Sequence, residues 1–359
     1  MTQYVAMAVL LLTLRDLVHR RVRFAVVTLL GAIVFALLFV MTGMVEQFRQ
    51  EPVDTVAAVG ADHWVIAEGV PGPFNGVSVL PAGAANPGVA AAGASFSPIV
   101  VSRTSLTGAT VEPDDLVLIG IDVDGIGHPD VSEGRPVEAE NEVVIDDSAG
   151  TSIGDAVEIG GRPLTVVGHT AGTTLFAGFP VAFVSLPVAQ DLAFSTREVI
   201  SSIVVEGPLA ELPPGSKSLT AAEVIEDTRR PLENAVASVN LVRALLWIMS
   251  GIIIGAVVYL SALERQRDFA VLKAVGTSTR ALLASLTIQA VLIALAAVAV
   301  GAIIQLGVAP AFPLTIRVPA GAFWQVPVIA VVVAVIASAL GLRTVASSDP
   351  VDAFGGGHG

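Results

Sequence analysis

The sequence predicts an α-helical membrane protein with four transmembrane helices and a large α/β extracytoplasmic domain inserted between the first and second spans. Three observations predict this class. Only 14% of the 359 residues are charged and 53% are hydrophobic, whereas soluble domains carry about 25% charged residues. The hydrophobic residues gather in four long runs. The stretch between the first two runs has the composition of an ordinary acidic globular domain.

Each of the four apolar runs is long enough to cross a bilayer as a helix. The runs cover residues 22–45, 241–263, 282–306 and 325–343, and a hydrocarbon core of about 30 Å needs roughly 20 helical residues. The fourth run is rich in β-branched residues, so a buried strand is its alternative. We favour a helix, because an isolated strand cannot satisfy its backbone hydrogen bonds in lipid.

The residues before the first run predict a separate element. Residues 1–21 are apolar as far as Leu14 and charged towards their end. They are too short for a fifth span, and we expect a cytoplasmic, interfacial amphipathic helix with its basic end at the lipid headgroups. A cleaved signal peptide is the alternative for residues 22–45. That run exceeds the roughly 7–15 apolar residues of a signal peptide.

Basic residues near the ends of the runs predict the orientation. They cluster before the first run, between the second and third, and after the fourth, and such clusters stay on the cytoplasmic side. We therefore expect a multi-pass protein of the bacterial cell (inner) membrane with both termini in the cytoplasm. Residues 264–281 and the tail 344–359 would be cytoplasmic, and residues 46–240 and the loop 307–324 extracytoplasmic.

The extracytoplasmic segment 46–240 is predicted to be an α/β domain. Runs such as DLVLIGID and ISSIVVEG are typical of strands and are separated by Gly, Pro and Asp turns. Residues 219–242 indicate a helix that is broken near Pro231 and leads into the second span, so the domain and the span would be mechanically joined. Residues 47–240 hold 26 acidic and eight basic residues, and the net charge of −13 for the whole chain argues against nucleic-acid binding.

Composition and motifs predict no catalytic residue and no metal or cofactor in this chain. It has no cysteine, and its five histidines are scattered. Residues 122–133 partly match a calcium loop, but Ile126 stands where an oxygen ligand is needed, so we expect a polar turn. A Walker A motif needs a lysine after glycine, and neither Lys217 nor Lys273 follows one.

The most informative stretch lies between the second and third spans. Phe269, Leu272 and Val275 recur every three residues, which predicts an apolar stripe on a short helix that Gly276 can end. Such a helix could dock a cytoplasmic partner. A solvated basic loop fits the pattern equally well.

This stretch resembles the signature that follows the second span in FtsX/MacB-type (type VII, mechanotransmissive) ABC transporter permeases. The matching residues are Glu264, Arg265, Arg267, Asp268, Phe269, Ala270, Val271, Leu272, Lys273, Ala274, Val275 and Gly276. The N-terminal LRDLVHRRVRF and residues 141–168 and 343–354 resemble other motifs of the family in the same order. The resemblance therefore covers nearly the whole chain, and it is close to actinobacterial members labelled as glutamine-transport permeases.

The resemblance implies a MacB-like outer domain and a partner ATPase that binds ATP and Mg. It also implies a second permease copy, or a paralogous permease, in the complex. Residues 264–281 would form the cytoplasmic coupling helix, and its residues that couple to the ATPase would be Glu264, Arg265, Arg267, Asp268, Phe269, Leu272, Lys273, Val275 and Gly276. Movements driven by the ATPase would pass outward and act on a lipid, lipoprotein, peptide or glycolipid. Membrane lipids and an extracytoplasmic adaptor are further expected partners.

Three other functions stay open at this point. The outer domain could regulate an extracytoplasmic cell-wall enzyme through the same mechanism. The chain could be an amino-acid (glutamine-type) permease, although such permeases generally expose only short loops outside. It could also be a receptor or scaffold without transport.

Gly251 and Gly255 form a GxxxG pattern in the second span. This spacing lets two helix backbones approach closely in lipid, so we expect a packing contact within the chain or across a dimer. Because glycine is common in membrane helices, the pattern could also reflect composition alone.

Overall fold

The computed structural model describes residues 21–108, 115–264, 279–309 and 318–346. The chain divides into two compact units, which we call the helical unit (Met1–Glu46 and Ala237–Gly359) and the sheet unit (Gln47–Val236). The predicted interfacial helix at residues 1–21 and the predicted tail at 344–359 lie almost entirely outside the described residues.

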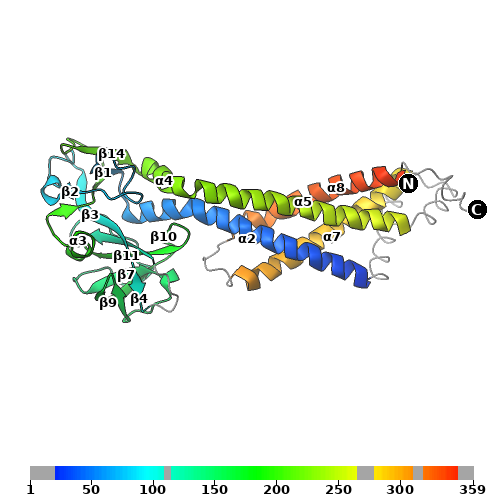
Figure 1. Cartoon of the computed structure of the whole chain (residues 1–359), viewed down its shortest axis with the longest axis horizontal. Helices are drawn as coiled ribbons and strands as arrows, with labels where there is room; N and C mark the ends of the chain where they lie inside the picture. The colour runs from blue at the N-terminus through cyan, green and yellow to red at the C-terminus, as the bar shows by residue number, and fades with distance from the viewer. Residues whose placement is uncertain (1–20, 109–114, 265–278, 310–317, 347–359) are drawn as a thin grey trace, which may run out of the picture. The chain divides into compact units, whose positions relative to one another are not determined.

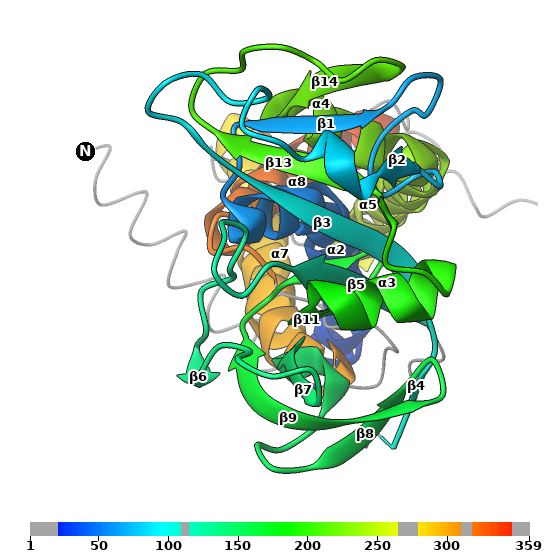
Figure 2. The same cartoon turned by 90° about the vertical axis from the view of Figure 1, so that its left-hand side faces the viewer.

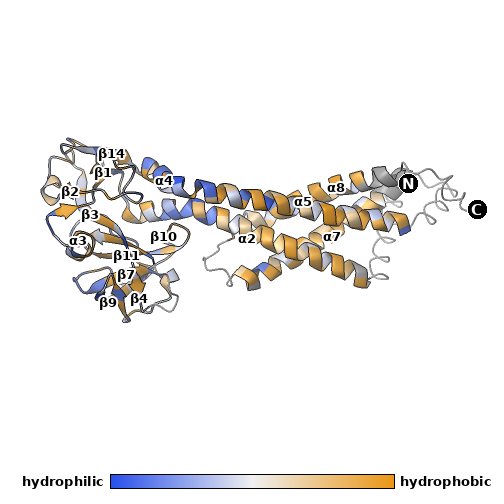
Figure 3. Ribbon diagram, viewed as in Figure 1, coloured by the Kyte–Doolittle hydropathy of each residue, from blue (hydrophilic) through white to orange (hydrophobic). Residues whose placement is uncertain are grey.

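Four helices supply the helical unit: α2 (Arg21–Val59), α5 (Glu233–Glu264), α7 (Thr279–Val308) and α8 (Ala322–Ala346) (Figure 1). Apolar residues cover most of their length, as the orange segments in Figure 3 show. Among the described residues, four helices are long and apolar enough to cross a membrane: Phe24–Val59, Ala221–Glu264, Ala284–Val308 and Ala322–Leu340. The predicted class, four apolar helices with an α/β domain between the first two, is confirmed.

The helices extend beyond the apolar runs in the sequence. The first run was expected to end at residue 45, whereas α2 continues to Val59. The second was expected to begin at residue 241, whereas α5 begins at Glu233, directly after the 3-10 turn η3 (Arg230–Leu232) and the helix α4 (Ala221–Arg229). The fourth run forms the helix α8 and not a strand. Hydropathy marks the part of a helix that suits lipid, and a helix does not have to end there.

The sheet unit is built on a mixed, twelve-stranded sheet with the order β14-β1-β13-β3-β5-β11-β7-β9-β8-β4. The strands from β14 to β8 follow one another downward in Figure 2. In addition, β10 pairs with β11, β6 pairs with β9, and β2 pairs with β12 in a small separate sheet. The β5–β11 and β7–β9 pairs are parallel. The strands are β1 (His63–Ala67), β2 (Leu80–Pro81), β3 (Ser95–Thr104), β4 (Leu106–Thr107), β5 (Leu116–Ile121), β6 (Glu133–Gly134), β7 (Glu142–Asp146), β8 (Ala156–Ile159), β9 (Arg162–Thr170), β10 (Thr174–Leu175), β11 (Phe179–Ser185), β12 (Val199–Ile200), β13 (Ser202–Glu206) and β14 (Ser216–Thr220).

Both faces of the sheet are buried, and each carries its own hydrophobic core. Side chains alternate along a strand, so Leu116 and Leu118 of β5 enter one core while Val117 and Ile119 enter the other. The first core is covered by α3 (Leu186–Phe194), which contributes Val188 and Ala189. The second core includes Val56 and Val59 from the end of α2 and Val224 from α4. Two helices adjoining the helical unit in sequence therefore pack on the same face.

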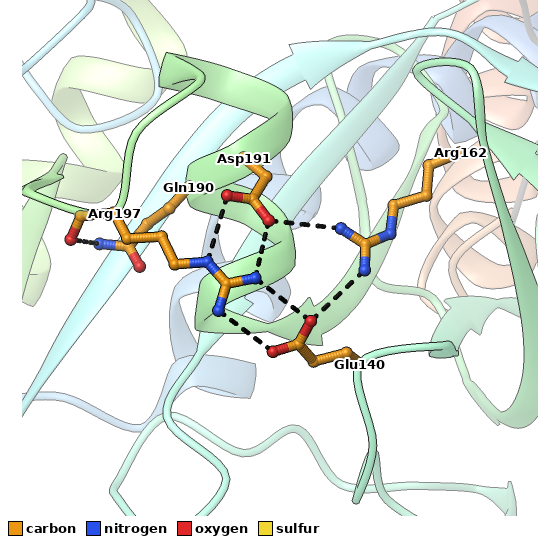
Figure 4. A network of polar contacts seen from close by, with 5 residues as sticks. All are labelled: Glu140, Arg162, Gln190, Asp191 and Arg197. Carbon is orange, nitrogen blue, oxygen red and sulfur yellow. Dashed lines mark hydrogen bonds and ion pairs between the residues drawn. The ribbon is translucent and has the colours of Figure 1, made fainter.

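An ion-pair network joins α3 to the neighbouring strands (Figure 4). Arg197 donates to Asp191 at 2.8 Å and lies 3.3 Å from Glu140, while Arg162 lies 3.5 Å from each of the two carboxylates. Arg197 lowers the pKa of Asp191 by hydrogen bonding to it. Exposed pairs of this kind contribute little one by one. Their effect here is to hold the turn after α3, together with Gln190, which donates to the carbonyl oxygens of Arg197 and Val199.

The pair formed by Arg135 and Glu142 makes the stability of the sheet unit depend on pH. Nη1 and Nη2 of Arg135 each donate a hydrogen bond to the carboxylate of Glu142. These bonds lower the pKa of Glu142 from 4.5 to about 2. A carboxyl whose pKa is lowered by folding adds stability above its unfolded pKa and loses it as the pH falls towards its folded pKa. The contribution is therefore lost between about pH 4.5 and pH 2.

We predict that Glu142→Gln lowers the urea midpoint of the sheet unit at pH 7 and reduces the fall of that midpoint on acidification. A variant with Trp247→Phe and Trp324→Phe keeps Trp64 as its only tryptophan, and this buried side chain reports unfolding by fluorescence. Glu158→Gln, at an exposed position on β8, is the control. An unchanged pH profile in Glu142→Gln would show that the pair contributes nothing to stability.

Candidate functional site

The predicted coupling segment lies outside the described residues, apart from its first residue. Glu264 is the last residue of α5, and the next helix, α7, begins at Thr279. The structure therefore describes the two helices that flank the segment. It gives no position for Arg265, Arg267, Asp268, Phe269, Leu272, Lys273, Val275 or Gly276.

In the helical unit, α2 and α7 cross at a glycine with almost no space between the backbones. A Cβ atom placed on Gly301 of α7 would lie 2.7 Å from the carbonyl oxygen of Ala32 and 2.9 Å from Cβ of Phe35. From the other helix, a Cβ on Gly31 would lie 3.1 Å from Cβ of Ala297. Small residues allow this close approach in membrane helices. The crossing fixes which part of α7 faces which part of α2.

Aromatic side chains surround α2 next to this crossing. Phe35 is fully buried and meets Trp247 of α5 edge to face, with 6.0 Å between ring centroids. One turn later, Phe39 stacks on Phe323 of α8 at 5.3 Å. Helix α2 thus contacts the other three helices of its unit.

Gly251 and Gly255, the residues of the GxxxG pattern, face α8. A Cβ atom on Gly251 would lie 3.3 Å from a methyl group of Val333, and one on Gly255 would lie 3.7 Å from Cβ of Ala337. The spacing to α8 is wider than at Gly301, where backbone atoms are the nearest neighbours. In this structure both glycines therefore face a helix of the same chain.

In the sheet unit, Glu51 of α2 is buried among polar groups of the β10–β11 hairpin. Its side chain is only 3% exposed. One carboxylate oxygen accepts from Thr174 Oγ1 at 3.1 Å and from Gln47 Nε2 at 3.0 Å, and the other accepts from the backbone N–H of Ala177 at 2.9 Å. One turn further along α2, Thr55 Oγ1 donates to the carbonyl oxygen of Thr174 at 3.0 Å. The end of α2 is therefore joined to the hairpin by hydrogen bonds as well as by the apolar contacts of the core.

A second polar contact joins α2 to α4 within the sheet unit. Arg229, at the end of α4, donates to the carbonyl oxygen of Arg49 through Nη2 at 2.6 Å and Nε at 3.2 Å. Pro52 lies inside α2 and has no N–H, so it leaves one carbonyl of the preceding turn without its usual donor. The guanidinium of Arg229 thus binds a carbonyl of α2 beside this weakened turn.

Glu51, Arg229 and Gly301 lie in no motif that predicts a packing or hydrogen-bonding role for them. An acidic residue just after an apolar run is ordinary on a solvated helix end, and nothing local shows that Glu51 is covered by a hairpin 120 or more residues later. One pattern in the sequence does indicate that the helix continues past the apolar run, namely the spacing of the apolar residues Val56 and Val59. Gly301 lacks the GxxxG spacing, so its close contact could not be separated from ordinary glycine content.

This chain is similar to known proteins over nearly its whole length. It matches the family of the MacB-like periplasmic core domain over residues 25–227 and that of the FtsX-like permease C-terminal region over residues 240–350. Two Mycobacterium tuberculosis proteins, the uncharacterized ABC transporter permeases Rv2563 and Rv0072, are each 40% identical to it, over 348 and 350 residues. These alignments cover 96% of this chain and 98% of each relative. The solved periplasmic region of MacB from Actinobacillus actinomycetemcomitans is 13% identical. The superposition covers 50% of this chain and 99% of the MacB region, with a TM-score of 0.32.

We predict that Gly301→Leu disrupts the packing of α2 on α7, because its side chain would have to occupy the space of the α2 backbone. Overpacking of this kind costs about 1–3 kcal/mol. The measurement is the temperature at which the detergent-solubilised chain loses its monodisperse peak in size-exclusion chromatography. Gly307→Leu on the same helix is the matched control, because nothing lies within 4 Å of its Cβ position. Equal losses in both variants would refute a specific crossing.

We also predict that Arg229→Met loosens α4 from α2 by removing two hydrogen bonds to one carbonyl, an effect of about 1 kcal/mol. Faster hydrogen exchange of the amides around Arg49 and Arg229 would report it. Arg230→Met changes the neighbouring, more exposed arginine and should leave exchange there unaltered. The contact is unimportant if the two variants behave alike.

Proposed function

This chain belongs to the FtsX-like ABC transporter permeases that carry a MacB-like periplasmic core domain, and we propose that it couples ATP hydrolysis by a separate ATPase subunit to movements of its extracytoplasmic domain. Its site of action would be the bacterial cell membrane, with the sheet unit outside and both termini in the cytoplasm. A second copy of the chain, or a paralogous permease, would complete the membrane part of the transporter.

The observation that carries this proposal is the pair of contacts made by the single helix α2. Within the helical unit α2 meets α7 at Gly301, and within the sheet unit it contributes Val56, Val59 and the buried Glu51. A helix of 39 residues is about 58 Å long, whereas the hydrocarbon core takes only about 30 Å. Force applied to α2 by α7 would therefore be delivered to the sheet by the same helix.

The second connection runs through α4 and α5. These helices are separated only by the 3-10 turn η3, and α4 contributes Val224 to the same core as the end of α2. Arg229 of α4 binds the Arg49 carbonyl of α2. The two connections between the membrane and the sheet therefore act on one face of the sheet and would move together.

Force would enter at the segment between α5, which belongs to the second connection, and α7, which contacts α2 of the first. Residues 264–276 join α5 to α7, so displacement of this segment moves both helices. We assign it as the coupling helix, in which Phe269, Leu272 and Val275 contact the ATPase and the charged residues surround that contact. ATP and Mg would be bound by the ATPase, and this chain would contribute no catalytic residue.

We propose that the moving outer domain acts on a lipid, lipoprotein, peptide or glycolipid outside the membrane, by mechanotransmission and not through a pore between the helices. Both faces of the sheet are filled by packed side chains, so the sheet would transmit displacement as one layer. The substrate would then be displaced by the surface of the sheet unit.

We predict that Phe269→Asp or Leu272→Asp abolishes stimulated turnover by the partner ATPase, because a carboxylate cannot occupy an apolar contact without a large desolvation cost. The permease is purified in detergent with the ATPase that accompanies it, and phosphate release is measured. Val77→Asp, at a surface site in the sheet unit that is 80% exposed, is the control. If the ATPase binds and turns over equally well in all three variants, residues 264–276 are not the coupling site.

A further inference from the structure

The loop between β10 and β11 has a backbone conformation that its residues rarely adopt. Phe176 and Ala177 have φ angles of 53° and 72°, and Gly178 follows with 104°. A positive φ brings Cβ of a non-glycine residue against its own backbone, so two in succession are strained. Ser195 is the other non-glycine residue with positive φ in the described part of the chain, and it ends the helix α3, where this conformation is common.

The strained loop is held on one side by Glu51. Successive backbone N–H groups in such a turn converge and form a site for an anion. The carboxylate of Glu51 occupies this position, where it accepts from the N–H of Ala177 at 2.9 Å and from that of Gly178. Because Thr174 Oγ1 also donates to Glu51, the carboxylate contacts both the start and the tip of the hairpin.

The same loop is held on its other side by the sheet. The guanidinium carbon of Arg103, on β3, lies 3.8 Å from the centroid of the Phe176 ring. A cation in this place is attracted to the face of the ring. The loop therefore lies between a carboxylate of α2 and a cation of the central sheet.

We propose that loop 176–178 is a two-state element whose conformation is set by the position of α2. While Glu51 is in place, its carboxylate keeps Phe176 and Ala177 in the left-handed region and Phe176 against Arg103. When α2 is displaced along its axis, the N–H groups lose their acceptor, the loop relaxes to an ordinary turn and the Phe176 ring leaves the guanidinium of Arg103, a side chain that is exposed on β3 in both states. This inference rests on the proposed function for the movement of α2, whereas the dependence of the loop on Glu51 belongs to this chain alone.

The first test measures hydrogen exchange of the amides of Ala177 and Gly178 in the full-length permease in detergent, without an ATPase. Glu51→Ala should accelerate exchange at these two amides about tenfold. Glu51→Gln, which puts an N–H donor in place of one carboxylate oxygen, should release the same two amides. Asp54→Asn, at an exposed position on the same helix, is the control. Wild-type exchange in Glu51→Ala would overturn the proposal.

The second test asks whether Glu51 imposes the strain, and it does not need Glu51→Ala to fold. Ala177→Gly should raise the thermal midpoint of the wild-type chain, because glycine adopts the left-handed conformation without strain. The same change should have no benefit in Glu51→Gln, where the loop has relaxed. Ser195→Gly serves as the matched control and should be equally beneficial in both backgrounds. An equal gain from Ala177→Gly in both backgrounds would show that the loop does not depend on Glu51.

The third test uses the complex with the partner ATPase. Exchange at loop 176–178 should differ between the ATP-bound and ADP-bound complexes in the wild type and should not differ in Glu51→Gln. If turnover depends on Phe269 and Leu272 but the loop is the same in both nucleotide states, the two-state proposal is wrong and the proposed function stands. If turnover is independent of Phe269 and Leu272, the first two tests still decide the role of Glu51.

Discussion

A polypeptide that crosses hydrocarbon must make its backbone hydrogen bonds within its own helices, and the rest of this structure depends on that constraint. It accounts for the apolar part of α2, which continues without a break to Val59. The same continuous helix therefore makes the contact with Gly301 of α7 and, further along, the hydrogen bonds of Glu51. With a flexible connection after the apolar part of α2, a displacement at one of these contacts would not be passed to the other.

The helices that continue into the sequence of the helical unit pack on one face of the sheet. The core that contains Val56, Val59 and Val224 lies on the face opposite α3. Parallel pairing of β5 with β11 places the two strands nearest the Glu51 hairpin in the middle of the sheet, where both of their faces are buried. The remaining face carries α3 and its ion pairs with Arg162 and Arg197. Within the sheet unit, the end of α2 and α4 thus pack on one face, and α3 packs on the other.

Much of this architecture could be predicted because its causes are local. Four apolar runs, the short basic segments between them and the alternation in DLVLIGID each report the surroundings of their own residues. The junction could not be predicted, because its partners are distant in sequence: Glu51 binds residues 174 and 177, and Gly301 meets Ala32. The continuation of α2 beyond the apolar run could not be predicted for a related reason. Hydropathy falls after residue 45, where the apolar run ends. The helix itself continues to Val59, and its later apolar residues Val56 and Val59 pack in the core of the sheet unit.

The missing N–H of Pro52 has a consequence for the direction of motion. The turn of α2 that contains Pro52 has one hydrogen bond fewer than the others, and its bending stiffness is lowest there. That turn adjoins the buried Glu51. A sideways tilt of the membrane part would be taken up as a change of angle at this turn, whereas a push or pull along the axis would still reach the sheet. Under the proposed mechanism, the missing hydrogen bond at Pro52 would let α2 bend at this turn while a displacement along its axis still reaches the sheet.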